Sequence, residues 1–398
     1  MGWSPFRKTG LTYRNSDAYG GYTLITPIGG DAVYLLDESG RVVHRWRSPG
    51  FEPGYGYLLP GGNLLVRGQP VATSMVTVGE PTGKADILLE LDWESNEVWR
   101  WEHSGFHHDM CRMPNGHTLV IVWESVPMEL ASRIRGGLPQ ETVERITSDQ
   151  HFMPFILQGV GVGGRPRFEG MISDALWEID SAGRPIHIWH AYEHFDPEVD
   201  LIGPLDFPNE WTHINAVELT HQGEVLISSQ KLDKVLKISW PEGKVLWEWG
   251  GPGRLSHQHD PTVTPEGNLL VFDNGTHHPL QGRSRVIEVD FETREIVWQY
   301  VSSPVFSMLS LHIAGAERLP NGNTLICEGE SGRLLEVTGE GMICWEWISP
   351  FEHSFKGIPS VMLFRAHRYS ANGIELEGRK LEAAYYEELN RKRGLSSG

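Results

Sequence analysis

The sequence predicts a six-bladed, all-β propeller, because two kinds of β-hairpin alternate along the chain and each recurs six times. One hairpin ends in an aromatic residue, and its copies end at Trp46, Trp101, Trp189, Trp249, Tyr300 and Trp347. The other has a glycine in its turn, and these are Gly62, Gly116, Gly223, Gly267, Gly322 and Gly373. Alternating apolar residues around Gly, Asn and Asp turns are typical of antiparallel hairpins. Two hairpins make one four-stranded blade, and six blades around an axis form a propeller.

The order of the hairpins also predicts how the ring closes. The first aromatic copy precedes the first glycine copy, so residues 22–49 have no inner strands of their own. The last glycine copy, around Gly373, lacks outer strands. We therefore expect residues 22–49 to pair with residues 361–378, which makes residues 1–398 a single propeller domain.

Two segments lie outside the repeat. Residues 125–170 interrupt the second complete blade, and a loop of this length is typical of a lid. Residues 379–393 show helical periodicity, with Leu381, Ala384, Tyr385 and Leu389 on one stripe. We expect a C-terminal helix there that packs on the outside of the ring.

Composition limits the partners. With 39% hydrophobic and 22% charged residues in 398, the chain reads as a soluble globular protein. A net charge of −18 argues against nucleic acid and against an anionic membrane surface, because a negative field repels phosphate. The first residues lack the apolar core of a secretory signal, which favours a cytoplasmic location over a periplasmic one reached after removal of a signal. The three cysteines have neither metal-site nor disulfide spacing, so we expect buried free thiols.

Histidines gather at equivalent places in the repeat. Eight residues before the turn glycines stand Gly54, His108, Asn215, His259, Ala314 and Arg365, and ten before them stand Glu52, Phe106, His213, His257, His312 and Leu363. Because side chains alternate along a strand, both positions are expected to face the central channel. Five histidines and one arginine then converge at one end of the channel, which indicates a functional site.

Other polar residues are expected around this site. Asp109 and Asp260 follow two of the histidines and are predicted to face away from the channel and orient a neighbouring imidazole. The second strand of each blade returns to the same rim with Arg67, Glu124, Gln230, Asn274 and Glu328. The insertion at 125–170 starts from that rim and is expected to cover the histidines.

Several motifs together resemble the bacterial aryl-sulfate sulfotransferases, over roughly residues 20–370. They are Phe106-His-His-Asp-Met110, Glu210-Trp-Thr-His-Ile-Asn-Ala216, Leu226-Ile-Ser-Ser-Gln230, Gln258-His-Asp260, Leu269-Leu-Val-Phe-Asp-Asn-Gly275, Leu319-Pro-Asn-Gly-Asn-Thr-Leu325 and Phe364-Arg-Ala-His-Arg-Tyr369. The resemblance implies a propeller that moves a sulfuryl group between phenols without a nucleotide donor or other cofactor.

The resemblance also implies residue roles. His259 would take the sulfuryl group covalently, while His108 and His213 would hold sulfate oxygens and protonate the leaving phenolate. The family places an arginine after the serine pair, where this chain has Gln230-Lys231. Arg365 or Lys231 would then supply the positive charge that clamps the sulfate. We expect a small aromatic or anionic substrate, in contact with His257, His312, Asn215, Gln230 and Lys231.

The residues alone leave two alternatives. His213, His257, His259 and His312 could hold Mn²⁺, Zn²⁺ or Fe²⁺, because neutral imidazoles are good ligands. A metal there would suit a lyase or a hydrolase. The remaining possibility is a propeller that binds a ligand without catalysis.

Overall fold

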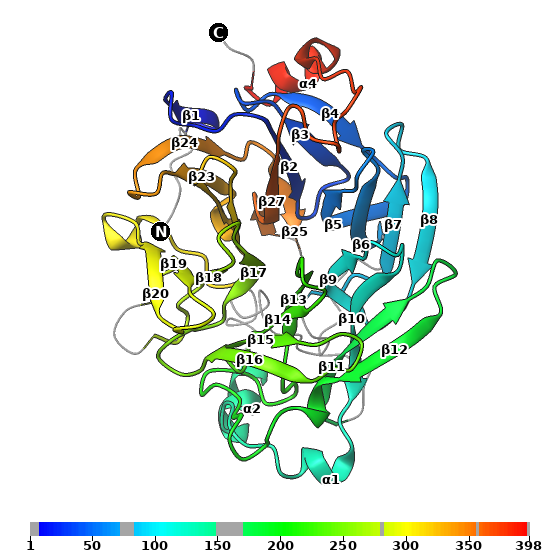
Figure 1. Cartoon of the computed structure of the whole chain (residues 1–398), viewed down its shortest axis with the longest axis vertical. Helices are drawn as coiled ribbons and strands as arrows, with labels where there is room; N and C mark the ends of the chain where they lie inside the picture. Colours follow the sequence, from blue (N-terminus) through cyan, green and yellow to red (C-terminus); the bar gives the residue numbers. More distant parts are fainter. Residues whose placement is uncertain (1–7, 72–82, 149–169, 279–281, 356–357, 396–398) are drawn as a thin grey trace.

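The structure is a computed structural model that describes residues 8–71, 83–148, 170–278, 282–355 and 358–395. Six antiparallel sheets stand around a central axis (Figure 1). Five sheets have four strands, and the sixth has an added fifth. The predicted six-bladed propeller is confirmed.

From the axis outward, the blade that closes the ring consists of β27 (Leu363–Tyr369), β2 (Tyr22–Pro27), β3 (Val33–Leu36) and β4 (Val42–Trp46). The next blade along the chain consists of β5 (Phe51–Leu58), β6 (Leu64–Pro70), β7 (Ile87–Leu91) and β8 (Glu97–Glu102). It is followed by the blade of β9 (Phe106–Arg112), β10 (Thr118–Ser125), β11 (Ile172–Ile179) and β12 (Pro185–His190). The fourth blade consists of β13 (Ile214–Leu219), β14 (Val225–Ser229), β15 (Lys234–Ile238) and β16 (Val245–Gly250). The fifth consists of β17 (His259–Val263), β18 (Leu269–Asp273), β19 (Arg285–Val289) and β20 (Ile296–Tyr300). The sixth consists of β21 (Gly315–Arg318), β22 (Thr324–Glu328), β23 (Arg333–Val337) and β24 (Ile343–Ile348), with β1 (Gly10–Arg14) as its added fifth strand. A separate hairpin joins β25 (His353–Phe355) to β26 (Ile358–Ser360). The helices are α1 (Met128–Ala131), α2 (Gln140–Ser148) and α4 (Glu387–Lys392), with 3-10 turns η2 (Ala191–Glu193), η3 (Val305–Ser307), η4 (Gly329–Ser331) and η5 (Ala383–Tyr386).

Four of the repeated aromatic residues fasten their blade to the next. The indole N–H donates to a carbonyl in the outer hairpin of the following blade, in the pairs Trp101–Gly183, Trp189–Gly243, Trp347–Gly40 and Trp249–Arg294. Glycine allows the close approach in the first of these pairs, since a Cβ on Gly183 would lie 2.6 Å from the Trp101 ring. The sequence repeat is therefore a repeat of contacts between blades.

The ring closes with one C-terminal strand. β27 pairs with β2, so this blade takes three strands from the N-terminal end and one from the C-terminal end. Two C-terminal strands were expected, but the apolar, β-branched sequence of β2 occupies the second position and residues after Tyr369 form turns. Gly373 accordingly lacks the positive φ of 80–89° seen at the other five turn glycines.

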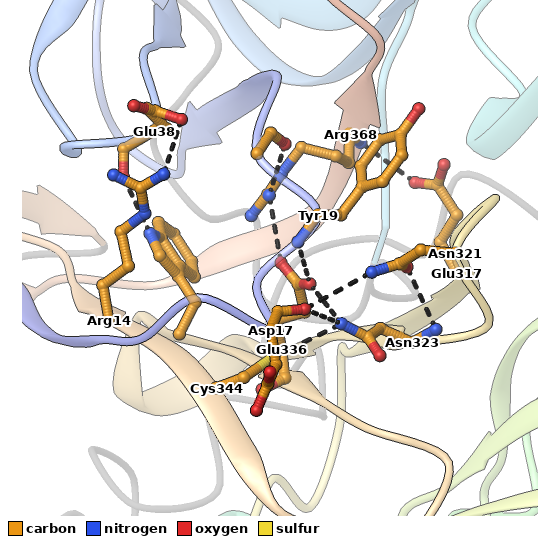
Figure 2. A network of polar contacts seen from close by, with 12 residues as sticks. Arg14, Asp17, Tyr19, Glu38, Glu317, Asn321, Asn323, Glu336, Cys344 and Arg368 are labelled. Carbon is orange, nitrogen blue, oxygen red and sulfur yellow. Dashed lines mark hydrogen bonds and ion pairs between the residues drawn. The ribbon is translucent and has the colours of Figure 1, made fainter.

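A buried polar network joins the two chain ends at this seam, and Figure 2 shows it around Glu336. The Glu336 carboxylate accepts hydrogen bonds from the backbone N–H of Tyr19 at 2.6 Å and from Asn323 Nδ2 at 2.7 Å. Arg368 on β27 adds an ion pair at 3.1 Å and donates to the Gly20 carbonyl. One carboxylate thus holds the segment before β2, the β21–β24 blade and β27 together.

The C-terminal segment is less helical than its periodicity suggests. Residues 379–382 lie outside any helix, and the segment continues as η5 and then α4, beside β4 in Figure 1. Leu389 packs on the ring, whereas Tyr385 is 64% exposed. The attachment is polar instead: Asn390 is buried and exchanges two hydrogen bonds with the backbone of Val42.

The insertion between β10 and β11 contains α1 and α2, and its residues 149–169 lie outside the described residues, together with the expected cover over the histidines. Its described part contacts the loop after β12, where Gly137 and Leu138 donate to the carbonyls of Ile202 and Asp206. Within the described ranges, no helix is both long and apolar enough to cross a membrane.

Candidate active site

The backbone is irregular where the predicted histidines stand. Positive φ occurs at His108 (48°), His213 (47°), His257 (56°), Asp260 (54°) and Ile313 (49°). Strand pairing shifts register at β9, β13 and β17 in the same places. A left-handed residue inserts a bulge and interrupts the alternation of side chains. The expected single regular face along each inner strand therefore does not hold, and the side chains of His257 and His259 meet different partners.

His259 is held as a neutral imidazole with a defined tautomer. Its Nδ1 lies 2.8 Å from Asn274 Oδ1 and 3.0 Å from the His257 carbonyl. Asn274 is itself oriented, because its Nδ2 donates to the Ser310 carbonyl. Both neighbours of Nδ1 are acceptors, so Nδ1 carries the proton and Nε2 the lone pair, which accepts a long 3.3 Å bond from the Ile313 N–H.

The environment keeps this imidazole uncharged. Burial lowers the pKa of His259 to about 3, and the charges of Arg365 and His312 also lower it, against the hydrogen bonds to Nδ1. At neutral pH the Nε2 lone pair is therefore available to an electrophile.

His108 lies against two other histidines. Its ring centroid is 4.6 Å from that of His213, and its Nδ1 is 2.7 Å from His107 Nδ1. His107 stacks on Trp123 within its blade, and its Nε2 is 3.1 Å from Asp174 Oδ1. Burial lowers the pKa of His108 well below its usual value, and the charges of His213, His107 and Arg67 act in the same direction. Three imidazoles and one carboxylate thus form a connected chain.

His213 is paired with a buried carboxylate. Its Nδ1 lies 2.6 Å from Glu210 Oε2. Burial alone would raise the pKa of Glu210, but the charges of His213 and Lys231 outweigh it and hold the pKa at about 2. Lys231 is tied to the same segment, since its Nζ donates to the carbonyls of Phe207 and Glu210.

Two further predicted substrate contacts are also buried. The backbone N–H of Gln230 donates to the His213 carbonyl over 3.0 Å. Asn215 donates from Nδ2 to the Gln258 carbonyl, while its buried Oδ1 has no hydrogen-bond partner among the described residues.

Arg365 stands between two carboxylates. Its Nη1 is 2.8 Å from Asp109 Oδ2, its Nε is 3.1 Å from Asp260 Oδ1, and its Nη2 donates to the Asn215 carbonyl. Arg365, Asp109 and Asp260, here called the Arg365 clasp, join β27, β9 and β17. The two aspartates were expected to face away from the channel and orient imidazoles. They contact the guanidinium instead, because the bulges turn them inward.

Arg67 is a second buried guanidinium, and among the described residues it has no such carboxylate partners. It is 4% exposed, and its charged carbon lies 4.4 Å from the Phe364 ring and 5.9 Å from the Tyr55 ring. Within the described chain, its Nε has no hydrogen-bond partner and no carboxylate lies within ion-pair distance of it. Burial lowers the pKa of Arg67 only to about 10, so the group stays charged at neutral pH.

The side chains of the other two predicted histidines have acidic partners of their own. His257 Nε2 is 3.0 Å from Asp206 Oδ2, with His277 beside it, and His312 Nδ1 is 2.5 Å from Glu330 Oε1. Among the described residues, the group that could hold a metal is Asp206, His257 and His277. Of the four histidines predicted as metal ligands, it includes His257 alone.

Sequence reasoning missed four acidic partners. Asp174, Glu210 and Asp206 pair with His107, His213 and His257. Glu330 of η4 pairs with His312. Glu210 and Asp206 belong to the connection before β13, and Asp174 belongs to β11, so none occupies a position of the inner-strand repeat. Only Glu210 could have been predicted from its spacing, because it stands three residues before His213 within one motif.

Comparison with known proteins places half of the chain in a family. A family model described as arylsulfotransferase (ASST) matches residues 152–350. No curated protein matches the sequence. Among solved structures, a protein of unknown function from Bacteroides caccae is 13% identical with a TM-score of 0.51, over 87% of this chain and 98% of that one. A streptogramin B lyase is 12% identical with a TM-score of 0.46, over 87% of this chain and 84% of that one.

Proposed function

Because the chain belongs to the arylsulfotransferase (ASST) family, we propose that it moves a sulfuryl group between phenolic compounds through a histidine intermediate. The observation that supports this most is the state of His259, a buried neutral imidazole whose Nδ1 proton is fixed by Asn274. Such an imidazole presents one nitrogen lone pair, which is what attack on a sulfate ester requires.

In the first half of the reaction, Nε2 of His259 attacks the sulfur of an aryl sulfate. The N–S bond forms as the S–O bond to the aryl group breaks, and the phenolate leaves with the electron pair. The imidazole then bears the sulfuryl group on Nε2 and keeps its proton on Nδ1, where Asn274 and the His257 carbonyl accept from it. Attack on Nε2 displaces the long hydrogen bond from Ile313.

The leaving phenolate takes a proton from the neighbouring histidines. We assign His213 as the donor, because its Nδ1 lies 2.6 Å from the Glu210 carboxylate, which orients the ring. His108, whose ring packs on that of His213, contacts the sulfate oxygens. In the second half, an acceptor phenol returns a proton to this pair, its oxygen attacks the sulfur, and the N–S bond breaks to release His259.

Arg67 is the positive charge that we assign to the sulfate. The charge of Arg365 is balanced by Asp109 and Asp260, and that of Lys231 by Glu210. Arg67 has no such carboxylate within the described chain, and it is close enough to His108 to lower its pKa. A guanidinium can bind two sulfate oxygens at once, which suits the charge that develops on them in the transition state.

The test uses para-nitrophenyl sulfate as donor and phenol as acceptor with the purified full chain. We expect His259→Ala to lower transfer by about 10³-fold or more, since the nucleophile is removed. His117→Gln is the matched control, because His117 lies in the turn between β9 and β10, at the other end of β9 from His108, and pairs with Glu178. Without acceptor, radiolabelled donor should leave about one alkali-stable, acid-labile sulfuryl group per wild-type chain. Transfer that is unchanged in His259→Ala would remove His259 from this role.

A further inference from the structure

We propose that Asp206, His257 and His277 form a binding site for one divalent transition-metal ion, with Zn²⁺ as the ion that best suits the donors. Asp206 lies in the loop between β12 and β13, His257 just before β17, and His277 just after β18. The site does not include the imidazole of His259, and it shares only His257 with the four-histidine set considered at first.

The distances fit three ligands around one ion. His257 Nε2 is 3.0 Å and His277 Nδ1 is 3.9 Å from Asp206 Oδ2, and all three ligand atoms lie within 4.8 Å of one another. Ligand atoms that share a Zn²⁺ ion at about 2.0–2.2 Å are separated by roughly 3 to 4 Å. Two imidazoles and one carboxylate are a common donor set for zinc, with a fourth position left for water or substrate.

A simple His257–Asp206 ion pair accounts for only part of this arrangement. The His277 side chain is 9% exposed, and its ring centroid lies 4.1 Å from that of His257. Within the described chain its ring has no hydrogen bond, and Nδ1 faces Asp206 Oδ2 from beyond hydrogen-bond distance. An ion between the three atoms would give the His277 nitrogen a partner at bonding distance.

The neighbouring cationic side chain leaves the site open. Lys231 does not occupy the site, since its Nζ bonds to the carbonyls of Phe207 and Glu210.

The surrounding backbone holds the ligands in place. His257 has a strained φ of 56°, and Asp233 Oδ1 accepts its N–H at 2.8 Å. Gly203 allows the close approach, because a Cβ there would lie 2.5 Å from Asp206 Oδ2 and 3.0 Å from the His277 ring. The insertion supports the third ligand, since Leu138 donates to the Asp206 carbonyl. Ligands oriented in this way bind a metal more tightly than free ones.

The metal site is connected through the backbone of His257 to His259, the proposed nucleophile. The carbonyl of His257 accepts from His259 Nδ1 at 3.0 Å, so an ion on the His257 ring would fix the backbone that orients His259. This positioning role rests on the proposed function, whereas metal binding itself does not.

The experiment is titration of the tag-free full chain, after treatment with a chelator, with Co²⁺ followed by visible absorption and with Zn²⁺ followed by calorimetry. We expect one equivalent of either metal, with the visible bands of Co²⁺ bound by nitrogen and oxygen. Asp206→Asn and His277→Gln should each weaken Zn²⁺ binding by at least about 10-fold. His278→Gln is the matched control, because the adjacent His278 pairs with Asp273 instead. Circular dichroism of each variant verifies that it is folded.

Two results would overturn the proposal: no stoichiometric Zn²⁺ binding by the wild-type chain, or binding that a folded His277→Gln variant leaves unchanged. For the positioning role, removal of the metal should lower kcat for sulfuryl transfer by about 10-fold, and Zn²⁺ should restore it in the wild type but not in His277→Gln. If the wild type binds Zn²⁺ but transfers no sulfuryl group, the proposed function fails and the metal site stands.

Discussion

Two buried arginines in the same channel have opposite surroundings. Arg365 and Arg67 are each 4% exposed, and both lie over the Tyr55 and Phe364 rings. Arg365 is held by two carboxylates and a carbonyl, at 2.8 to 3.1 Å. Arg67 lacks any carboxylate at ion-pair distance within the described chain.

The difference distinguishes a structural charge from a binding charge. A buried ion pair is stable because each charge compensates the other, and loss of one partner leaves the other unpaired. An unpaired buried charge costs free energy that folding alone does not justify, so a ligand of opposite charge is its natural partner. Residue type, burial and aromatic contacts are nearly equal here, and only the partners separate the two roles.

Removal of Arg365 tests the difference between the two arginines with the largest expected effect. We expect Arg365→Met to lower the free energy of unfolding by about 3–5 kcal/mol, because Asp109 and Asp260 would be left buried without a cation. Urea denaturation followed by tryptophan fluorescence measures the change. The triple variant with Asp109→Asn and Asp260→Asn should recover a large part of it. A loss below about 1 kcal/mol would show that the clasp is not structural.

Arg67→Met is the matched substitution at the second arginine. We expect a free energy of unfolding within about 1 kcal/mol of the wild type, because no ion pair is lost. The kcat/KM for an aryl sulfate donor should instead fall by about 10²- to 10³-fold, the usual cost of one transition-state donor. Arg67→Lys should recover only part of it, since an ammonium cannot bind two oxygens in the planar geometry of a guanidinium. If the Arg67→Met variant is strongly destabilised but keeps its rate of sulfuryl transfer, Arg67 is a structural charge and the assignment of the two arginines is reversed.

This comparison also separates what could be predicted from what could not. The propeller was predictable because each hairpin is local, and because its aromatic and turn-glycine positions recur in the sequence. The gathering of His108, His213 and His259 followed from the same repeat. Ring closure by a single C-terminal strand could not be predicted from the repeat. It depends on the pairing of β2 with β27, two segments that are distant in the sequence.

The side-chain contacts of the site could not be predicted from the repeat, for a physical reason. Strand alternation assumes a regular backbone, but Ile313 and Asp260 adopt positive φ where glycine would ordinarily signal a bulge. No local pattern marks such residues, so the inward turn of Asp109 and Asp260 was missed. Asp206 is supplied by a loop, and its approach to His257 depends on the tertiary fold alone.

The smallest expected effect concerns a third carboxyl group beside the clasp. Burial raises the pKa of Glu218 to about 8, and the charges of Asp260 and Asp109 add to the rise. The folded state therefore binds a proton that the unfolded state releases near pH 4.5. This contribution to stability is complete below that pH and is lost as the pH rises through 8, by up to about 1.4 kcal/mol per pH unit.

Glu218→Gln removes that titration while keeping the shape of a protonated carboxyl group. Across pH 6 to 8.5 the wild type should lose stability relative to this variant, because ionised Glu218 would add a third negative charge near a single guanidinium. Urea unfolding at both pH values gives the difference, with Glu266→Gln in an exposed turn as the control. A variant that differs from the wild type equally at both pH values would mean that Arg365 already compensates all three carboxyl groups. The clasp would then hold spare positive charge, and Arg67 would no longer be the only candidate for the sulfate.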